Sequence, residues 1–332
     1  MNTNSDKSNH FCHLHVHTEY SMMDSTIMIK DLVKTAKNRG HTHIAMTDHG
    51  NLHGAIDFYL TAQKEKITPI IGCELFCQPF VLNYKFLKEH KDILPSDDKK
   101  IYNPFHIVVL AKNTRGYHNL LKLVSQGYIG DKLKDIPVVS YDDFKKYGKD
   151  LIALSSCTRG EFANLVKLLK SKNDPDELLF SESPSPQKII FLNALRNYVE
   201  KITEIFGPDH YYVELIDNNL IEQKLLLPSL VEAAKYFSLP IVASADAHYL
   251  EPEFANTHAL ALAIKNGLTM RDIRERMHTS RFHLCSDEEM TSIFSRWPEA
   301  ITNTQRIAEE CSDVFIDMGT YHLPKINLGS KE

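Results

Sequence analysis

Histidine recurs at every second position near the start of the chain, at His13, His15 and His17. Asp246 and His248 repeat the same spacing far along the sequence. Residues two apart in a β-strand project from one face, so each run offers neighbouring nitrogen or oxygen ligands on a rigid backbone. The pattern therefore predicts a metal site.

Other side chains that can bind metal lie near further apolar segments, and they are Asp24, His49, Glu74, His106 and Cys157. A set of histidine, carboxylate and thiolate ligands suits zinc, manganese or iron, whereas calcium and magnesium favour oxygen. Glu74 and Asp246 are candidates to bridge two ions. Clustered ions can clamp both reacting oxygens of a phosphate ester and generate hydroxide near neutral pH, so the predicted chemistry is phosphoester hydrolysis. Taken singly, His106 or Cys157 also fits a structural role.

Short β-branched segments alternate with longer segments of helical period, which is typical of βα units around a parallel sheet. The predicted strands are residues 11–16, 43–47, 69–75, 106–111, 151–155, 211–215 and 240–244. The predicted helices are 29–36, 51–65, 114–126, 160–170, 188–206, 219–237, 253–266 and 299–311. In βα barrels the carboxyl ends of the strands meet at one mouth, where we expect the metal-binding side chains to gather.

The composition fits a large globular protein, with 332 residues, 43% hydrophobic and 24% charged. A formal net charge of -5 argues against a wholly basic surface for nucleic acid, so any DNA contact is expected to be local or led by metal. The six cysteines form no CxxC pair, which favours reduced thiols. The sequence shows neither a secretion signal nor a membrane span, so we expect a cytoplasmic protein.

Six motifs together resemble the PHP (polymerase and histidinol phosphatase) domain family, in the form found at the N-terminus of bacterial DNA polymerase III alpha subunits. The motifs are residues 13–21, 46–52, 71–74, 106–113, 154–161 and 245–249. The resemblance implies an α/β fold, a distorted (β/α)7 TIM-like barrel, with a cleft for up to three divalent metal ions. Residues 79–104 and 172–187 are expected to be surface insertions.

The resemblance also implies nine metal ligands, and the chain retains a suitable residue at each position. They are His15, His17, Asp24, His49, Glu74, His106, Cys157, Asp246 and His248. Alternation places His13 on the same face as His15 and His17, so we expect it to support a ligand or to pack in the core. Asp48 is a candidate to orient a ligand or to cap the next helix. Arg159 is a candidate to hold a substrate phosphate or to form an ion pair at a helix start.

The resemblance divides the chain into a flexible N-terminus (1–10), a metal-binding barrel (11–296) and a C-terminal helix and tail (297–332). The tail is similar to the junction with a polymerase palm, and the palm itself is absent, so we expect no DNA synthesis by this chain. The implied function is metal-dependent phosphodiester hydrolysis, as a 3'-5' exonuclease acting on DNA 3' ends beside polymerase III holoenzyme components. The alternatives are a small-molecule phosphatase of the histidinol phosphatase type and a noncatalytic module of a replicative polymerase.

Overall fold

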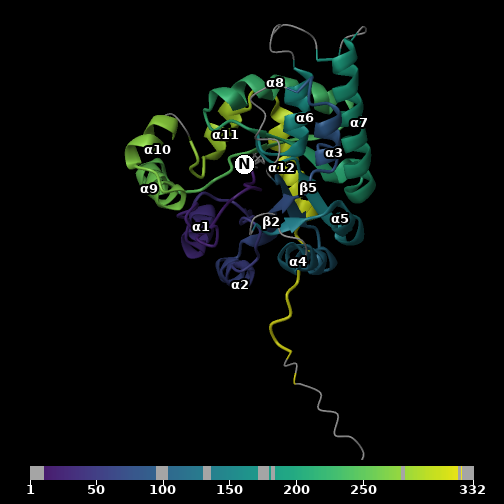
Figure 1. Cartoon of the computed structure of the whole chain (residues 1–332). Coiled ribbons are helices and arrows are strands. Elements are labelled where there is room, and N and C mark those ends of the chain that lie inside the picture. Colours follow the sequence, from purple (N-terminus) through teal and green to yellow (C-terminus); the bar gives the residue numbers. More distant parts are fainter. Residues whose placement is uncertain are drawn as a thin grey trace, which may run out of the picture.

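The computed structural model describes residues 11–94, 104–129, 136–170, 179–180, 184–277, 281–320 and 323 (Figure 1). The predicted flexible segment 1–10 and most of the predicted junction after residue 320 lie outside this part of the chain. The fold is a curled, mixed sheet with helices around its outside, which confirms the distorted α/β barrel.

The sheet confirms six of the seven predicted strands. In order they are β1 (His43–Met46), β2 (Thr68–Cys77), β3 (Phe105–Ala111), β5 (Leu151–Leu154), β6 (Tyr211–Ile216) and β7 (Ile241–Ser244), and the short β4 (Val138–Val139) pairs with β2. The expectation of a wholly parallel sheet is wrong at β3, which runs antiparallel to both β2 and β5. Antiparallel neighbours need no crossover helix, so strand patterns in the sequence do not reveal the reversal.

Residues 11–16 lie where the seventh predicted strand was expected, but they form no regular strand. The segment instead closes the curl between β1 and the chain after β7. The N–H of Ala45 donates to the carbonyl of His13 at 3.0 Å, and the N–H of His17 donates to that of Ala247 at 2.9 Å.

Side chains take over part of the hydrogen bonding of this first segment. The N–H of Cys12 donates to the hydroxyl of Thr304 at 3.0 Å, and that of Val16 donates to the hydroxyl of Thr47 at 2.8 Å. Every buried backbone donor needs an acceptor, and these hydroxyls serve in place of a neighbouring strand's carbonyls. The segment is therefore held firmly without a regular ladder.

All eight predicted helices are confirmed. They are α1 (Ile29–Asn38), α2 (Ala55–Glu65), α4 (Thr114–Ile129), α6 (Glu161–Leu169), α7 (Pro186–Phe206), α8 (Ile221–Tyr236), α9 (Ala255–Asn266) and α12 (Pro298–Glu310). The helices α3 (Tyr84–Glu89), α5 (Tyr141–Tyr147), α10 (Met270–Met277) and α11 (Asp287–Ile293) were not predicted. Each of these four spans two turns or so, too short for apolar periodicity to stand out.

Helix α12 closes one end of the barrel. Apolar side chains of six strands and of the first segment form a compact interior cluster with Ile307, Ala308 and Cys311 of this helix. The side chain of Asn303 donates to the carbonyl of Ile241, the first residue of β7, at 2.8 Å. The helix thus lies at the amino end of β7, which leaves the carboxyl end open for a site.

The predicted insertion at 79–104 is partly anchored in the core. Phe80, Val81 and Leu82 are buried, and the buried carboxylate of Glu161 accepts their three N–H groups at 2.7 Å each. The insertion at 172–187 lies largely outside the described residues, and α7 begins within it.

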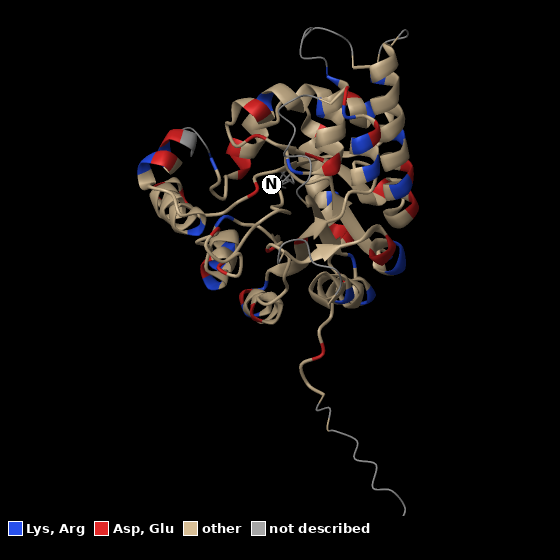
Figure 2. Ribbon diagram, viewed as in Figure 1, with Lys and Arg blue, Asp and Glu red and all other residues tan. Residues whose placement is uncertain are grey.

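Acidic and basic side chains are mixed over the outer helices (Figure 2). No described helix combines the length and the apolar character that crossing a bilayer requires.

Candidate metal centre

The nine predicted ligands come from six separate parts of the chain. His15, His17 and Asp24 belong to the first segment and the turns after it, His49 follows β1, Glu74 lies on β2, His106 on β3, Cys157 follows β5, and Asp246 and His248 follow β7. His106 is the second residue of β3, an end that a parallel strand would place away from the mouth. Because β3 is antiparallel, His106 lies opposite Phe76 near the carboxyl end of β2, at the mouth with the others.

The carboxylate of Glu74 lies among four histidines. Its Oε1 is 3.0 Å from Nδ1 of His106 and 3.7 Å from Nε2 of His15. Its Oε2 is 2.8 Å from Nδ1 of His49 and 3.6 Å from Nε2 of His17. Two oxygens that each face two imidazoles suit a carboxylate that bridges metal ions.

Asp246 lies on the other side of the same histidine pair. Its Oδ1 is 3.4 Å from Nε2 of His15, 3.3 Å from Nε2 of His17 and 3.7 Å from Nδ1 of His248. The Nε2 atoms of His15 and His17 are themselves only 3.1 Å apart. The two carboxylates and the three imidazoles therefore converge on one small volume.

Asp24 joins a further part of the cluster. Its Oδ2 is 3.3 Å from Nε2 of His49, and its Oδ1 is 3.7 Å from Nε2 of His248 and 3.8 Å from Nε2 of His258. Lys265 also contacts Oδ2, at 2.5 Å. His258 and Lys265 lie on α9 and were not predicted, because neither follows a strand.

Two oxygen groups fix the orientation of the histidine pair. Nδ1 of His15 donates to the buried carboxylate of Glu214 at 2.8 Å, and Nδ1 of His17 donates to the hydroxyl of Ser21 at 3.1 Å. These hydrogen bonds assign the proton to Nδ1, which leaves Nε2 as the ligand atom facing the carboxylates. Glu214 was missed by the sequence analysis. It lies two residues after the inward-facing Tyr212 on β6, and that period of two is the signal that points to it.

Asp48 holds Ser21 and Thr18 in place by hydrogen bonds. It accepts the hydroxyl of Ser21 at 2.6 Å, and the N–H and hydroxyl of Thr18 at 2.6 and 2.7 Å. Of the two predicted roles, orienting a ligand matches these contacts, because Ser21 in turn holds His17. Asp48 thus acts through Ser21 and does not face the centre itself.

The pKa values of the histidine pair shift in opposite directions. Burial lowers the pKa of His15, but the charges of Glu214, Asp246 and Glu74 outweigh it and raise that pKa well above its ordinary value. Burial and the neighbouring imidazoles of His49 and His248 lower the pKa of His17 well below its ordinary value. In the absence of metal, the Nε2 atoms of His15 and His17, which lie 3.1 Å apart, must share one proton so that their lone pairs do not repel. A divalent cation would satisfy both, so the donor set fits a metal.

The carboxylates of the cluster favour their ionised form. Burial raises the pKa of Glu74, but the positive charges of His106 and His15 outweigh burial and hold it well below its ordinary value. Hydrogen bonds with His258 and His49 likewise outweigh burial and lower the pKa of Asp24. Anionic oxygens at neutral pH are what a cation site requires.

Cys157 lies on the turn after β5. Burial and the charges of Glu74 and Asp246 raise the pKa of its thiol to about 12. A Cβ added to Gly160 would lie 2.0 Å from the carbonyl of Ser155, so only glycine permits this tight turn. The backbone that carries the thiol is therefore closely constrained, and bound metal would be needed to ionise the thiol.

His13 does not join the centre. Cys12 and Leu14 both face the barrel interior, and a bend at His15 then changes the phase of the segment. His13 consequently lies on the other face, where its Nε2 contacts the carbonyl of Cys285 at 2.9 Å. The expectation that alternation places it with His15 and His17 is wrong, and its role in packing matches the contact.

A pocket of about 620 Å³ lies beside the centre and shares His106 with it. Its lining includes Phe76, Phe105 and the cationic side chain of Arg159, together with Lys167, which pairs with Glu222 at 2.6 Å. Arg159 is exposed. The pocket thus combines aromatic and cationic surfaces next to the metal-binding side chains.

Comparison with known proteins agrees with this geometry. The family model described as PHP domain matches residues 13–218. The DNA polymerase III subunit alpha of Borreliella burgdorferi is 36% identical over 304 residues, which cover 91% of this chain and 24% of that protein. The corresponding subunit of Aquifex aeolicus is 32% identical over 333 residues, which cover 97% of this chain and 26% of that protein.

The chain spans about a quarter of the length of these curated relatives. Among solved structures, a two-domain protein from Bacteroides vulgatus with a predicted PHP-like metal-dependent phosphoesterase aligns at a TM-score of 0.38 and 12% identity, covering 72% of this chain and 52% of that one. The assignment depends on the sequence match, which takes in more than half of the residues. The chain belongs to the PHP domain family.

Proposed function

We propose that the chain is a metal-dependent phosphoesterase that removes nucleotides from DNA 3' ends, as a 3'-5' exonuclease. The observation that supports this most is the position of Glu74, whose two oxygens lie within 3.7 Å of four histidines from separate segments. A cluster of this kind, at the mouth of a barrel and beside a cationic pocket, suits hydrolysis of an anionic ester.

The proposed ligands are the nine residues predicted from the sequence, and they would hold up to three zinc, manganese or iron ions. Metal bound there would supply hydroxide near neutral pH and stabilise charge on the phosphate oxygens. Glu214 and Ser21 keep Nε2 of His15 and His17 turned toward the centre. Asp48 holds Ser21 in place, so we assign it to positioning.

The neighbouring pocket is the proposed place for the terminal nucleotide. Arg159 carries a planar guanidinium that can bind two phosphate oxygens at once. Phe76, which is partly exposed, offers a ring on which a base can stack, and stacking tolerates any base. Pocket and centre share His106, so a phosphate held by Arg159 would lie near the proposed ligands.

The curated relatives are polymerase subunits, which suggests a setting beside polymerase III holoenzyme components in the cytoplasm. A second candidate function is hydrolysis of small phosphate monoesters, which the limited volume of the pocket favours. The third is a noncatalytic module in which metal stabilises the fold, since metal bound only by the native state adds to its stability.

The test compares these candidates on one preparation. The chain is loaded with zinc or manganese, its metal content is measured by elemental analysis, and it is given a 5'-labelled primer and, separately, p-nitrophenyl phosphate. We expect a ladder of primers shortened from the 3' end, which a chelator stops. Hydrolysis of the monoester alone would favour the second candidate. Stabilisation by metal without either reaction would favour the third.

Two variants and one control make the test specific. Asp246→Asn should lower primer shortening by at least about 100-fold, the size of effect seen when a group that stabilises the transition state is removed. Arg159→Ala should raise KM for the primer more than it lowers kcat. Asp57→Asn, on the outer helix α2, changes the same chemical group away from the centre and should leave hydrolysis unchanged. Equal activity in all three proteins would contradict the proposed site.

A further inference from the structure

A second group of side chains that can bind metal lies outside the centre. The ligand atoms of His283, Cys285 and Glu289 all lie within 4.8 Å of one another. Nε2 of His283 is 3.2 Å from Oε1 and 3.3 Å from Oε2 of Glu289. His283 and Cys285 are buried and two residues apart, and an isolated bridge between His283 and Tyr249 keeps this backbone extended. The spacing places both ligands on one face.

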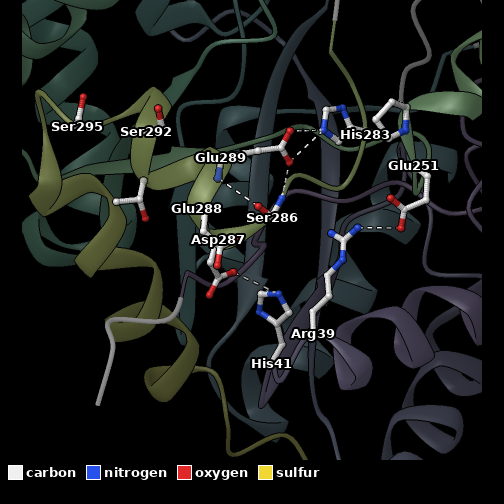
Figure 3. Close-up of a pocket in the computed structure, with 12 residues that line it drawn as sticks. Arg39, His41, Glu251, His283, Ser286, Asp287, Glu288, Glu289, Ser292 and Ser295 are labelled. Atoms are coloured by element: carbon white, nitrogen blue, oxygen red, sulfur yellow. Dashed lines mark hydrogen bonds and ion pairs between the residues drawn. The ribbon is translucent and has the colours of Figure 1, made fainter. Parts of the chain in front are cut away.

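This group, here called the α11 cluster, forms part of the wall of an open pocket of about 1040 Å³ (Figure 3). Glu251 pairs with Arg39 at 2.9 Å, and Asp287 lies 3.4 Å from Nε2 of His41. Figure 3 shows Glu289 turned toward His283 instead. Four carboxylates and one guanidinium line the pocket, so its charge favours entry of a cation.

We propose that His283, Cys285 and Glu289 bind a divalent metal ion, zinc by the chemistry of the ligands. A thiolate, an imidazole and a carboxylate are the three kinds of ligand that zinc takes, and the fourth position of a tetrahedral ion would face the pocket and hold water. At zinc-ligand distances of about 2.0–2.3 Å, tetrahedral neighbours lie roughly 3.3–3.8 Å apart. The spacing between His283 and Glu289 is already close to that range.

Hydrogen bonds around the α11 cluster hold the ligands in place. Ser286 and Glu289 form a capping box at the start of α11, in which the N–H of Ser286 donates to Oε2 of Glu289 at 2.7 Å. The carbonyl of Cys285 contacts Nε2 of His13 at 2.9 Å, on the first segment of the barrel. A metal ion would thus fasten the start of α11 to the segment that carries His15 and His17. Its role would be to stabilise this junction.

The ordinary alternative is an ion pair between His283 and Glu289 without metal. The thiol separates the two interpretations, because an ion pair makes no use of it. Burial and the nearby charge of Glu289 raise the pKa of Cys285 to about 12, so the free thiol keeps its proton. Binding a metal ion would release that proton and produce a metal-thiolate bond, which can be observed directly.

The test uses cobalt as a spectroscopic substitute for zinc. Cobalt bound to thiolate gives a near-ultraviolet charge-transfer band, and Cys157 in the main centre would contribute its own. We therefore titrate Co²⁺ into the full chain carrying Cys157→Ser. The proposal expects the band to persist there, to vanish in Cys157→Ser/Cys285→Ser, and to need about 10-fold or more added cobalt when Glu289→Gln replaces the carboxylate. Glu200→Gln, an exposed carboxylate on α7 outside the lining of this pocket, is the matched control and should leave the titration unchanged.

A second measurement does not require the Cys157→Ser substitution. Cys285→Ser in the otherwise unchanged chain should weaken the band and lower bound zinc by one ion per chain, while primer hydrolysis stays as it was. The proposal is overturned if the band is absent from folded Cys157→Ser at saturating cobalt, or if Cys285→Ser alters neither band nor zinc content. The cobalt band and the zinc content do not depend on whether the main centre is an exonuclease, so failure of this proposal is distinct from failure of the proposed function.

Discussion

The main centre and the α11 cluster offer similar ligands but are built differently. The proposed ligands of the main centre come from positions as far apart as His15 and His248, whereas those of the α11 cluster lie within 283–289. Glu74 is 2% exposed, while the side chain of Glu289 is 47% exposed. The first site therefore needs the whole barrel, and the second needs one extended strand and one helix cap. Substitutions of the same ligand types at the two sites should therefore change the free energy of unfolding by very different amounts.

The groups that hold the ligands in place also differ between the two sites. At the main centre, Glu214 and Ser21 fix the far nitrogens of two imidazoles, and both are buried. At the α11 cluster, the partner of Glu289 is the backbone of Ser286 in the capping box. A buried group that loses its partner has no water to replace it, whereas an exposed one does. Matched substitutions at the two sites can therefore test the comparison.

The largest effect is expected for Glu74→Gln. It removes the negative charge that faces four histidines, and leaving buried cations without their partner costs about 3–5 kcal/mol. Urea unfolding with chelator present should show this loss of stability. In a separate assay with added metal, the variant should not hydrolyse the primer. Glu65→Gln, which breaks the exposed pair with Lys37, is the control and should leave the stability nearly unchanged. Equal stability of the two variants would refute the difference in coupling.

The next effect is a pH dependence of the metal-free protein. Hydrogen bonds and charges from Asp24 and Glu74 outweigh burial and raise the pKa of His49 to about 9 from an ordinary 6.5. A raised histidine pKa adds stability that is fully present below 6.5 and is lost as the pH rises through 9. The pKa values of His17 and His248 are lowered, so both are neutral in either state above 6.5. Stability should thus fall as pH rises, by on the order of 3 kcal/mol from His49, and the raised pKa of His15 adds to this fall.

Urea unfolding between pH 6.5 and 8.5 in chelator measures this fall. His49→Gln should flatten the dependence, while His53→Gln, a nearby exposed histidine, should leave it as it is. A fall of the same size in His49→Gln would assign the effect to other groups. Saturating zinc should also flatten it, because metal in place of the proton removes the titration.

Much of the main centre could be predicted from the sequence because its ligands follow strands or occupy them. Six strands and eight helices were found because their apolar periodicity reports directly on burial. His106 was predicted as a ligand on the assumption that β3 is parallel to its neighbours. Only because β3 is antiparallel does His106, near its start, lie at the mouth. Strand direction depends on pairing between distant segments, which one sequence does not display.

Other features depend on contacts that have no local signal. The bend at His15, which separates His13 from the centre, follows hydrogen bonds from Thr47 and Ala247 to the first segment. His258 and Lys265 reach Asp24 from a helix that no motif marks. The α11 cluster was missed although its ligands are adjacent in sequence, because a single histidine and cysteine near acidic residues are common on surfaces.

A smaller effect is expected for Glu214→Gln. The amide can still accept from Nδ1 of His15, but it lacks the charge that makes the imidazole a better ligand. Metal affinity at the main centre should fall by about 10–100-fold, and added metal should restore hydrolysis. Isothermal titration with zinc and activity against metal concentration measure both quantities. Activity that stays low at saturating metal would mean that Glu214 does more than orient His15.

The smallest effect is expected for Glu289→Gln in the metal-free protein. The side chain of Glu289 is about half exposed although His283 is buried, so solvent screens the pair, and screened pairs contribute about 0–1 kcal/mol. Its amide oxygen can still accept from the N–H of Ser286, so the capping box should survive. Urea unfolding in chelator should therefore barely separate this variant from the parent, in contrast to Glu74→Gln. A loss above about 2 kcal/mol would show that the α11 cluster is coupled to the barrel as tightly as the main centre is, because an ion pair screened by solvent on one side does not reach that value.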